Sequence, residues 1–264
     1  MTGSLARLFD LSGRVAIVTG GSRGLGLQIA AALGEYGAAL ALIARNPDGL
    51  DAAVGTLAAA GCRAAGFAAD LREQQAAAPL VERVLERFGR IDILVNNAGA
   101  TWGAAAEDYP LEGWDKVIDL NVGALFRVTQ AVARAAFLKA GGGAVINIAS
   151  IEGLQGHHPG RLGTVAYNTS KGAVISFTEA LGCEWGKYNI TVNAICPGFF
   201  PSKMTQATLN RLGEDKLAAH APLKRLGDDE DLKGVTLLFA SDAGKHVTGQ
   251  WLAVDGGVSV ITGG

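Results

Sequence analysis

Cysteine is scarce in this chain, and the positions of its cysteines argue against two kinds of small scaffold. Cys62, Cys183 and Cys196 are odd in number, and no two of them form a C-x-x-C pair. The sequence therefore offers neither a disulfide framework nor a zinc site, and we expect no bound metal. Cys183 and Cys196 lie inside apolar segments, where a thiol is usually buried, so we expect both in the core.

Long hydrophobic runs are also missing. No uninterrupted apolar stretch of about 18 residues occurs, which argues against a membrane-spanning helix. Residues 1–14, MTGSLARLFDLSGR, lack the long apolar stretch of a secretory signal. We expect a soluble, cytoplasmic protein without a membrane partner.

Charge is low and balanced, whereas glycine is abundant. Charged residues make up 18% of the chain, the formal net charge is −2, and no basic block stands out. Binding to nucleic acid is therefore not expected as a main role. The 37 glycines among 264 residues are separated by apolar runs, which indicates tight turns and close backbone approaches.

Short apolar runs alternate with longer amphipathic segments along the whole chain. Nearly continuous apolar character is typical of parallel strands that are covered on both faces. The predicted strands are Arg14–Thr19, Ala38–Ala44, Cys62–Ala69, Ile91–Asn96, Ala144–Ala149, Ile190–Cys196 and Gln250–Val254. The clearest predicted helices are Leu25–Tyr36, Gln74–Phe88, Gly113–Ala140 and Val165–Lys187. With no linker or repeat, this alternation predicts a single α/β domain over residues 1–264: a doubly wound parallel sheet of about seven strands with helices on both faces.

Residues 199–225 break the alternation. The segment follows a predicted strand, is compatible with helix, and has Pro222 near its end. Because it lies beyond the carboxyl end of a strand, where ligands bind in such sheets, we expect it to form a lid.

A glycine-rich turn, TGGSRGLG at residues 19–26, joins the first predicted strand to a helix. A dinucleotide pyrophosphate needs backbone donors at a helix N-terminus and no Cβ in its way. Gly20 permits the tight turn, and Gly24 and Gly26 allow close approach of the phosphates and of the neighbouring strand. The alternative is a plain strand-to-helix turn; the strand before and the helix after favour cofactor binding.

Two arginines favour NADP(H) over NAD(H). An NAD site usually has an acidic residue about 20 residues beyond the turn, yet no acid lies between Leu40 and Asn46. Arg45 stands there instead, and Arg23 lies inside the glycine turn. Guanidinium groups suit a 2′-phosphate, since charge-assisted hydrogen bonds are the stronger kind. The alternative is that both arginines are merely solvated.

Candidate reacting groups occur at the ends of predicted strands and on one helix. Tyr167 and Lys171 are four residues apart, so they share a helix face. A phenol that serves as acid/base needs its pKa lowered from about 10, and a neighbouring ammonium acts in that direction. Ser150 ends an apolar strand, and Asn121 is a polar residue within a long helical stretch.

Taken together, these motifs resemble the short-chain dehydrogenase/reductase family, with its Rossmann-like fold, over essentially the whole chain. The resemblance extends to 3-oxoacyl-thioester reductases of bacteria. The family resemblance rests on these motifs: Thr19–Gly26, Asp70-Leu71, Asn96-Asn97-Ala98-Gly99, the series Asn121, Ser150, Tyr167 and Lys171, Pro197-Gly198 with Ser202, Val247-Thr248-Gly249 and Asp255-Gly256-Gly257.

The resemblance implies roles for individual residues. Tyr167 exchanges a proton with the substrate oxygen, Ser150 orients that oxygen, Lys171 binds the nicotinamide ribose, and Asn121 holds a water. The residues expected to bind the cofactor are Gly20, Ser22, Arg23, Gly24, Leu25, Gly26, Arg45, Asp70, Leu71, Asn97, Ala98, Gly99, Tyr167, Lys171, Pro197, Gly198, Phe200, Ser202 and Met204.

The substrate is expected to be a small-molecule carbonyl or alcohol, either a hydrophobic ketone or a 3-oxoacyl thioester. Its candidate contacts are Trp102, Ser150, His158 and Phe199. The alternative for the aromatic residues is that they pack the lid onto the body. A groove for an acyl carrier protein is not evident, and Arg127, Arg134 and Lys139 are its candidate residues.

Two other functions stay open, an NAD-dependent alcohol or sugar-alcohol dehydrogenase and a non-catalytic NADP(H)-binding redox sensor. The intact Ser150, Tyr167 and Lys171 argue against the sensor. The family resemblance further implies a homotetramer, or a dimer, assembled through residues 113–140, residues 165–187 and the apolar C-terminal segment.

Overall fold

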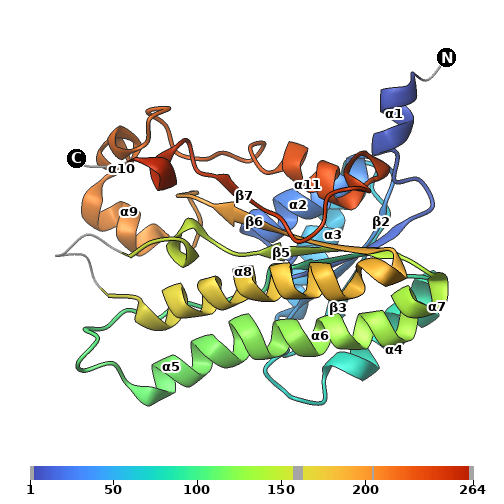
Figure 1. Ribbon diagram of the computed structural model, residues 1–264, viewed down its shortest axis with the longest axis horizontal. Coiled ribbons are helices and arrows are strands. Elements are labelled where there is room, and N and C mark those ends of the chain that lie inside the picture. Colours follow the sequence, from blue (N-terminus) through green and yellow to red (C-terminus); the bar gives the residue numbers. More distant parts are fainter. Residues whose placement is uncertain (1–2, 157–162, 204, 262–264) are drawn as a thin grey trace.

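The computed structural model describes residues 3–156, 163–203 and 205–261. In this part of the chain one seven-stranded sheet lies between two layers of helices (Figure 1). Its strands are β1 (Val15–Thr19), β2 (Ala39–Ala44), β3 (Ala64–Ala68), β4 (Ile93–Asn96), β5 (Gly143–Ile148), β6 (Ile190–Pro197) and β7 (Trp251–Val254). The order is β3-β2-β1-β4-β5-β6-β7, and every pairing is parallel. The predicted doubly wound parallel sheet is confirmed.

The main helices cover both faces of this sheet. One layer contains α2 (Gly24–Glu35), α3 (Pro47–Ala59) and α11 (Lys233–Ala240). The other contains α4 (Ala77–Phe88), a long helical segment and α8 (Val165–Trp185). The long segment consists of α5 (Leu111–Ile118), η1 (Asp119–Ala124), α6 (Leu125–Val132), η2 (Ala133–Phe137) and α7 (Leu138–Ala140). Helices α1 (Ser4–Phe9), α9 (Gln206–Leu212) and α10 (Glu214–His220) lie at the periphery (Figure 1).

Coverage on both faces explains why the strands are apolar throughout. All five residues of β1 are buried, and successive residues face opposite layers. Val18 packs with α2, α3 and α11, whereas Ile17 packs with α4 and the long helical segment. The polar residues on the central strands, such as Asn96, Asn147 and Asn193, are buried as well, so neither face of these strands is left wet.

A chain of buried polar side chains crosses one face of the sheet. Asn96 Nδ2 on β4 donates to Thr129 Oγ1 (2.8 Å) on α6 and to Asn147 Oδ1 (2.9 Å) on β5. Asn147 Nδ2 in turn donates to Thr178 Oγ1 (2.9 Å) on α8. All four residues are buried. The chain therefore fixes both helices to the two strands whose ends carry the candidate site.

Several expectations about the fold need correction. Helix α3 was not among the clear sequence predictions, although Asn46 caps it through Asp48 N (3.0 Å) and Pro47 occupies its first turn. The predicted helix 113–140 exists but contains two π-helical stretches, η1 and η2. Cys196 is buried as expected, whereas Cys183 is exposed because it lies on the outer side of α8.

The helices and the metal-ligating side chains of the described residues bear on membrane spans and metal sites. Within the described ranges, no helix is both long enough and apolar enough to cross a bilayer. The same residues contain no group of three His, Cys, Asp or Glu side chains placed to hold a metal ion. The cytoplasmic location stays a prediction.

The chain of buried polar side chains predicts that a substitution of its central residue, Asn147, destabilises the fold. Asn147→Ala leaves Asn96 and Thr178 with one hydrogen-bond partner fewer in the core, which should lower the free energy of unfolding by about 2 kcal/mol. Urea unfolding monitored by circular dichroism measures this change. The control is Thr56→Ala, which removes an exposed hydroxyl bonded to Ala52 O (3.0 Å) and should cost under about 0.5 kcal/mol. Equal effects of the two substitutions would contradict the role given to Asn147.

Candidate active site

The glycine turn between β1 and α2 restricts the residues at Gly20, Gly24 and Gly26, by backbone conformation or by lack of space. Gly20 and Gly24 adopt positive φ angles of 65° and 53°, which disfavour other residues. A Cβ on Gly20 would stand 2.8 Å from Asn97 Nδ2, and one on Gly26 would collide with the carbonyl of Gly20. None of the described side chains caps the start of α2 at Arg23. The first N–H groups of α2 therefore suit a phosphate, and phosphate binding at this turn stays a prediction.

Residues 97–99 support this turn from the end of β4. Asn97 Nδ2 donates to the carbonyls of Thr19 (2.9 Å) and Gly20 (3.2 Å). Thr19 Oγ1 accepts from the backbone N–H groups of Asn97 (2.9 Å) and Ala98 (3.0 Å). The side chain of Asn97 was expected to bind the cofactor. Its amide instead forms hydrogen bonds that hold the glycine turn in place.

The adenosine side of the predicted cofactor site contains an arginine that sequence reasoning missed. Arg23 and Arg45 are exposed, as a contact with a 2′-phosphate requires. Arg72 hydrogen-bonds to Asp70 through Nε (3.0 Å) and holds the pKa of that carboxyl at about 2, with Arg45 acting in the same direction. Asp70 and Arg45 therefore lie close together. The signal for Arg72 was its position two residues after Asp70.

Ser150 and Tyr167 are brought together at the carboxyl edge of the sheet. Ser150 is buried just beyond the end of β5 and starts the 3₁₀ turn η3 (Ile151–Gly153), where its Oγ accepts from Glu152 N (3.1 Å). The Ser150 hydroxyl lies close enough to Tyr167 to lower the pKa of its phenol. This pair sits where the substrate oxygen was predicted to bind.

The pKa of Tyr167 moves opposite to the predicted direction. Burial raises the pKa of its phenol to about 12, and the Glu152 carboxylate adds to this, whereas the hydrogen bond with Ser150 lowers it. The lowering of this pKa was expected from the Lys171 ammonium together with an oxidised nicotinamide. In the chain alone, desolvation of the phenolate outweighs the hydrogen bond from Ser150.

Lys171 lies beside Tyr167 as predicted and is buried. Its Nζ is 5.5 Å from the centroid of the Tyr167 ring and donates to the carbonyl of Ile148 (2.7 Å). Burial lowers the pKa of this ammonium to about 8, while the nearby Cys196 acts in the opposite direction. The positive charge of Lys171 is thus itself costly at this position.

Asn121 lies in the π-helix η1, and its side chain is fully engaged. Its Oδ1 accepts from Ala100 N (2.8 Å), and its Nδ2 donates to Ala100 O (3.0 Å) and Ser170 Oγ (2.9 Å). Ser170 Oγ donates to Tyr167 O (2.7 Å). The side chain therefore joins the segment after β4 to the helix that carries Tyr167, a function that the sequence did not suggest.

The predicted nicotinamide side divides into two parts. Pro197 ends β6, and Gly198 packs so closely on Asp255 that a Cβ would stand 2.6 Å from the Asp255 Cβ. Phe200, expected to contact the cofactor, is instead buried with its ring against Gly227. Ser202 Oγ pairs with Thr205 Oγ1 (3.0 Å). Met204 lies outside the described residues.

The substrate candidates are only partly placed. Trp102 packs its ring on Gly113 at the start of α5, with Lys116 Nζ 5.0 Å from its centroid, which favours a structural role. Phe199 is partly buried, and its carbonyl accepts from Gly227 N (3.0 Å). His158 lies outside the described residues. Ser150 is the candidate that directly adjoins Tyr167.

The sheet order and the glycine turn define the chain as an α/β protein of the dinucleotide-binding class. The sequence model described as short chain dehydrogenase matches residues 14–212, so the chain belongs to the short-chain dehydrogenase/reductase family. The predicted family membership is confirmed, and with it the prediction of an oxidoreductase.

Relatives in this family act on different substrates. A gluconate 5-dehydrogenase of Gluconobacter oxydans is 37% identical over 254 residues, covering 96% of this chain and 97% of that protein. A rhamnolipid-biosynthesis 3-oxoacyl-[acyl-carrier-protein] reductase of Pseudomonas aeruginosa is 38% identical over 256 residues, covering 94% and 97%. The crystal structure of a Burkholderia cenocepacia gluconate 5-dehydrogenase in complex with NADP and tartrate has a TM-score of 0.91 at 32% identity, covering 98% of this chain and all of that one.

The buried ammonium of Lys171 predicts a pH-dependent stability. Its folded pKa of about 8 lies below the ordinary value of 10.5, so between these pH values the unfolded chain binds more protons and stability rises with pH. Lys171→Met removes this dependence. We expect the variant to be more stable than the parent near pH 7, by up to about 3 kcal/mol, and the difference to shrink towards pH 10.

Thermal unfolding of both proteins across this pH range measures the difference. Lys245→Met replaces an exposed lysine and is the control, for which the difference from the parent should stay constant. A difference between Lys171→Met and the parent that does not change with pH would contradict the prediction.

Proposed function

We propose that the protein transfers a hydride between NADP(H) and a carbonyl or secondary alcohol, with Tyr167 as general acid/base. One observation carries this proposal: Ser150, Tyr167 and Lys171 meet at the carboxyl edge of the sheet, with Lys171 Nζ 5.5 Å from the ring centroid of Tyr167. Ligands of doubly wound sheets bind at this edge.

The residues of the glycine turn fit a dinucleotide. The positions without a Cβ at Gly20, Gly24 and Gly26 and the start of α2 suit its pyrophosphate. Arg23 and Arg45 would hold a 2′-phosphate, and Lys171 the nicotinamide ribose. When bound, the nicotinamide supplies or accepts the hydride.

The reaction requires a proton at the substrate oxygen, and Tyr167 is the group that provides it. With its pKa raised to about 12, the phenol is protonated near neutral pH, which is the form that donates to a carbonyl oxygen during reduction. Ser150 orients and polarises that oxygen.

NADP(H) is the proposed cofactor, with NAD(H) as the less favoured alternative. Arg23 and Arg45 are exposed, and no acid follows β2 in the position that binds a ribose 2′-hydroxyl. Solved relatives support this choice: the Burkholderia cenocepacia enzyme and Pseudomonas aeruginosa RhlG, 37% identical with a TM-score of 0.89 and covering 96% of this chain and 99% of that one, are both complexes with NADP.

Two substrate classes remain as proposals. A hydrophobic ketone or 3-oxoacyl thioester is the first, in keeping with the reductase relatives. A sugar acid or sugar alcohol is the second, and it is supported by the gluconate 5-dehydrogenases. Arg127, a candidate contact for an acyl carrier protein, is instead bonded to Asp119 (3.0 Å) and to the carbonyl of Leu71 (3.1 Å).

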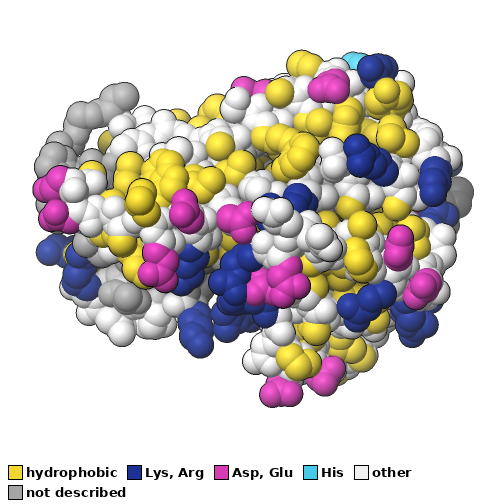
Figure 2. Space-filling view, turned by 90° about the horizontal axis from the view of Figure 1, so that it is seen from below, with side chains coloured by type: hydrophobic (Ala, Val, Ile, Leu, Met, Phe, Trp, Pro, Cys, Tyr) yellow, Lys and Arg dark blue, Asp and Glu magenta, His cyan; other side chains and the backbone are white. Residues whose placement is uncertain are grey.

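Single-domain organisation, the lid and the assembly are further proposals. Helices α9 and α10 occupy the predicted lid, residues 199–225, near the carboxyl edge of the sheet (Figure 1). A homotetramer, with a dimer as the alternative, would cover apolar side chains that are exposed in this chain. Figure 2 views the face that carries α5 and α6, where hydrophobic side chains are exposed. The exposed groups on the proposed interfaces are Leu111, Phe126, Leu138, Trp251, Leu252 and Ile261.

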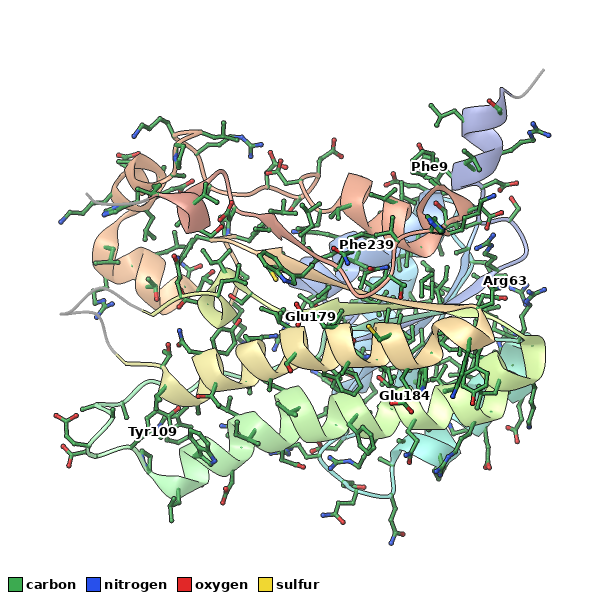
Figure 3. All side chains as sticks on the ribbon, viewed as in Figure 1. Phe9, Arg63, Tyr109, Glu179, Glu184 and Phe239 are labelled. Carbon is green, nitrogen blue, oxygen red and sulfur yellow. The ribbon has the colours of Figure 1, made fainter. Side chains whose placement is uncertain are left out.

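The phenol of Tyr167 should be essential for turnover. Tyr167→Phe removes the transferable proton and should lower kcat by about 10²–10⁴ while leaving the dissociation constant for NADPH unchanged. Tyr109→Phe is the matched control, because Tyr109 lies near the start of α8 but donates to Trp102 O (2.9 Å) (Figure 3). Full turnover in Tyr167→Phe would sink the proposal. A parent that binds NADPH but turns over no carbonyl would favour the redox sensor.

Initial rates of NADPH oxidation should separate the substrate classes. The probes are an acetoacetyl thioester, a set of unactivated ketones and a 5-oxo derivative of gluconate. Preference for the thioester supports a 3-oxoacyl reductase, whereas preference for the gluconate derivative supports the sugar-acid alternative. Turnover of ketones alone leaves a general carbonyl reductase.

The two exposed arginines should discriminate between the cofactors. Arg45→Ala, alone and with Arg23→Ala, should weaken NADPH binding by about 10–100-fold while NADH binding stays unchanged. Fluorescence titration of each nucleotide measures both constants. Arg63→Ala is the control, since Arg63 lies at the opposite end of the sheet (Figure 3). Faster parent rates with NADH than with NADPH would contradict this assignment.

A further inference from the structure

Asn168 follows Tyr167 directly in α8, and its side chain contacts the turn after Ser150. Its Nδ2 donates to the backbone carbonyl of Glu152 (2.8 Å), to the carboxylate Oε2 of Glu152 (3.2 Å) and to the carbonyl of Gln155 (3.3 Å). Its Oδ1 accepts from Thr164 Oγ1 (2.8 Å). The amide therefore joins both ends of the segment between Ser150 and Tyr167 to the first turn of α8.

The same turn orients the hydroxyl of Ser150. The backbone of Glu152 donates its N–H to Ser150 Oγ (3.1 Å) and accepts from Asn168 through its carbonyl. Gly153 lies flat on α8, since a Cβ there would stand 2.5 Å from the carbonyl carbon of Lys171. The packing of Gly153 limits how far the turn stands from the helix, and Asn168 limits how the turn can rotate.

The turn also places a negative charge near Tyr167. The Glu152 carboxylate raises the pKa of the phenol in addition to burial, so it lies close enough to act on it. The hydrogen bond from Asn168 to Oε2 restricts where this carboxylate stands. In the described part of the chain, the titratable groups around Tyr167 are Glu152 on the turn, Lys171 on α8, Cys196 on β6 behind Lys171, and Tyr109, whose hydroxyl bonds the backbone of Ala166.

We propose that Asn168 is a positioning residue for the reaction: it fixes the turn after Ser150 so that the Ser150 hydroxyl and the Glu152 carboxylate stand in defined places beside Tyr167. The inference rests on the proposed acid/base role of Tyr167 for its catalytic meaning. Asn168 acts through its neighbours and is not assigned a contact with substrate.

Titration of Tyr167 itself provides a readout that needs no substrate. The chain has four tyrosines, Tyr36, Tyr109, Tyr167 and Tyr188, so ¹³C-labelling of the tyrosine ring carbon gives few NMR signals, and Tyr167→Phe assigns the relevant one. Glu152→Gln keeps an acceptor for Asn168 but removes the charge, and should move the Tyr167 midpoint down by about one unit. Asn168→Ala removes one restraint on the carboxylate and should move the Tyr167 midpoint by less than Glu152→Gln does, and the double variant should add no further shift to that of Glu152→Gln.

Measurements of activity distinguish the positioning role of Asn168 from the effect of the Glu152 charge. Asn168→Ala should also lower kcat for the best carbonyl probe by about 10-fold, because Ser150 loses its orientation, while KM for NADPH stays unchanged. Glu152→Gln should retain most of kcat near neutral pH. Thr169→Ala, an exposed neighbour on the same turn of α8, is the control and should change neither quantity.

The outcomes are distinguishable. A Tyr167 midpoint that stays at the parent value in both Glu152→Gln and Asn168→Ala overturns the inference, whatever the activities. Should Asn168→Ala fail to fold, as judged by circular dichroism, the result with Glu152→Gln alone decides whether the turn acts on Tyr167. Undiminished turnover in Tyr167→Phe would refute the proposed function instead, while the titrations would still test the placement of the carboxylate.

Discussion

The parallel pairing of β1 with both β2 and β4 is the constraint on which the candidate site depends. Because all three strands run in the same direction, the glycine turn after β1 and the segment Asn97–Gly99 after β4 emerge at the same edge. They then approach so closely that Asn97 Nδ2 reaches two carbonyls of the turn, and a Cβ on Gly20 or Gly26 would prevent the contact. The same edge receives Ser150 from β5 and Pro197 from β6.

Desolvation, more than charge pairing, governs the protonation of the buried groups at this edge. It raises the pKa of Tyr167 to about 12 and lowers that of Lys171 to about 8, so the loss of hydration at both groups favours their neutral forms. A site of this kind stabilises a positive charge poorly on its own. The charged form of Lys171 is stabilised by any bound group that offers oxygen atoms to its ammonium. A negative charge that develops at the phenol oxygen of Tyr167 stabilises it too.

Much of the fold followed from local patterns, because buried parallel strands are apolar throughout and the glycine turn leaves a sterically distinctive sequence. What the sequence could not show were features decided by tertiary packing. Phe200, in the sequence PGFFP, was expected to contact the cofactor, and its ring packs against Gly227. Cys183 looks like a core thiol but faces outward on α8. The π-helix around Asn121 has no pattern of its own, since its residues also suit a regular helix.

The same π-helix constrains how this region can change in length. Its extra residue per turn places Asn121 against Ala100 while α5 packs on α8 and α6 packs on the sheet. Removing one residue between Asp119 and Ala124 would let the segment wind as an ordinary α-helix, but it would rotate one flank relative to the other by about 100°. The apolar stripe of α6 and the amide of Asn121 would then no longer face their partners together. Insertions and deletions should therefore be tolerated in the connecting loops and not along this helix, even though the helix lies near the surface.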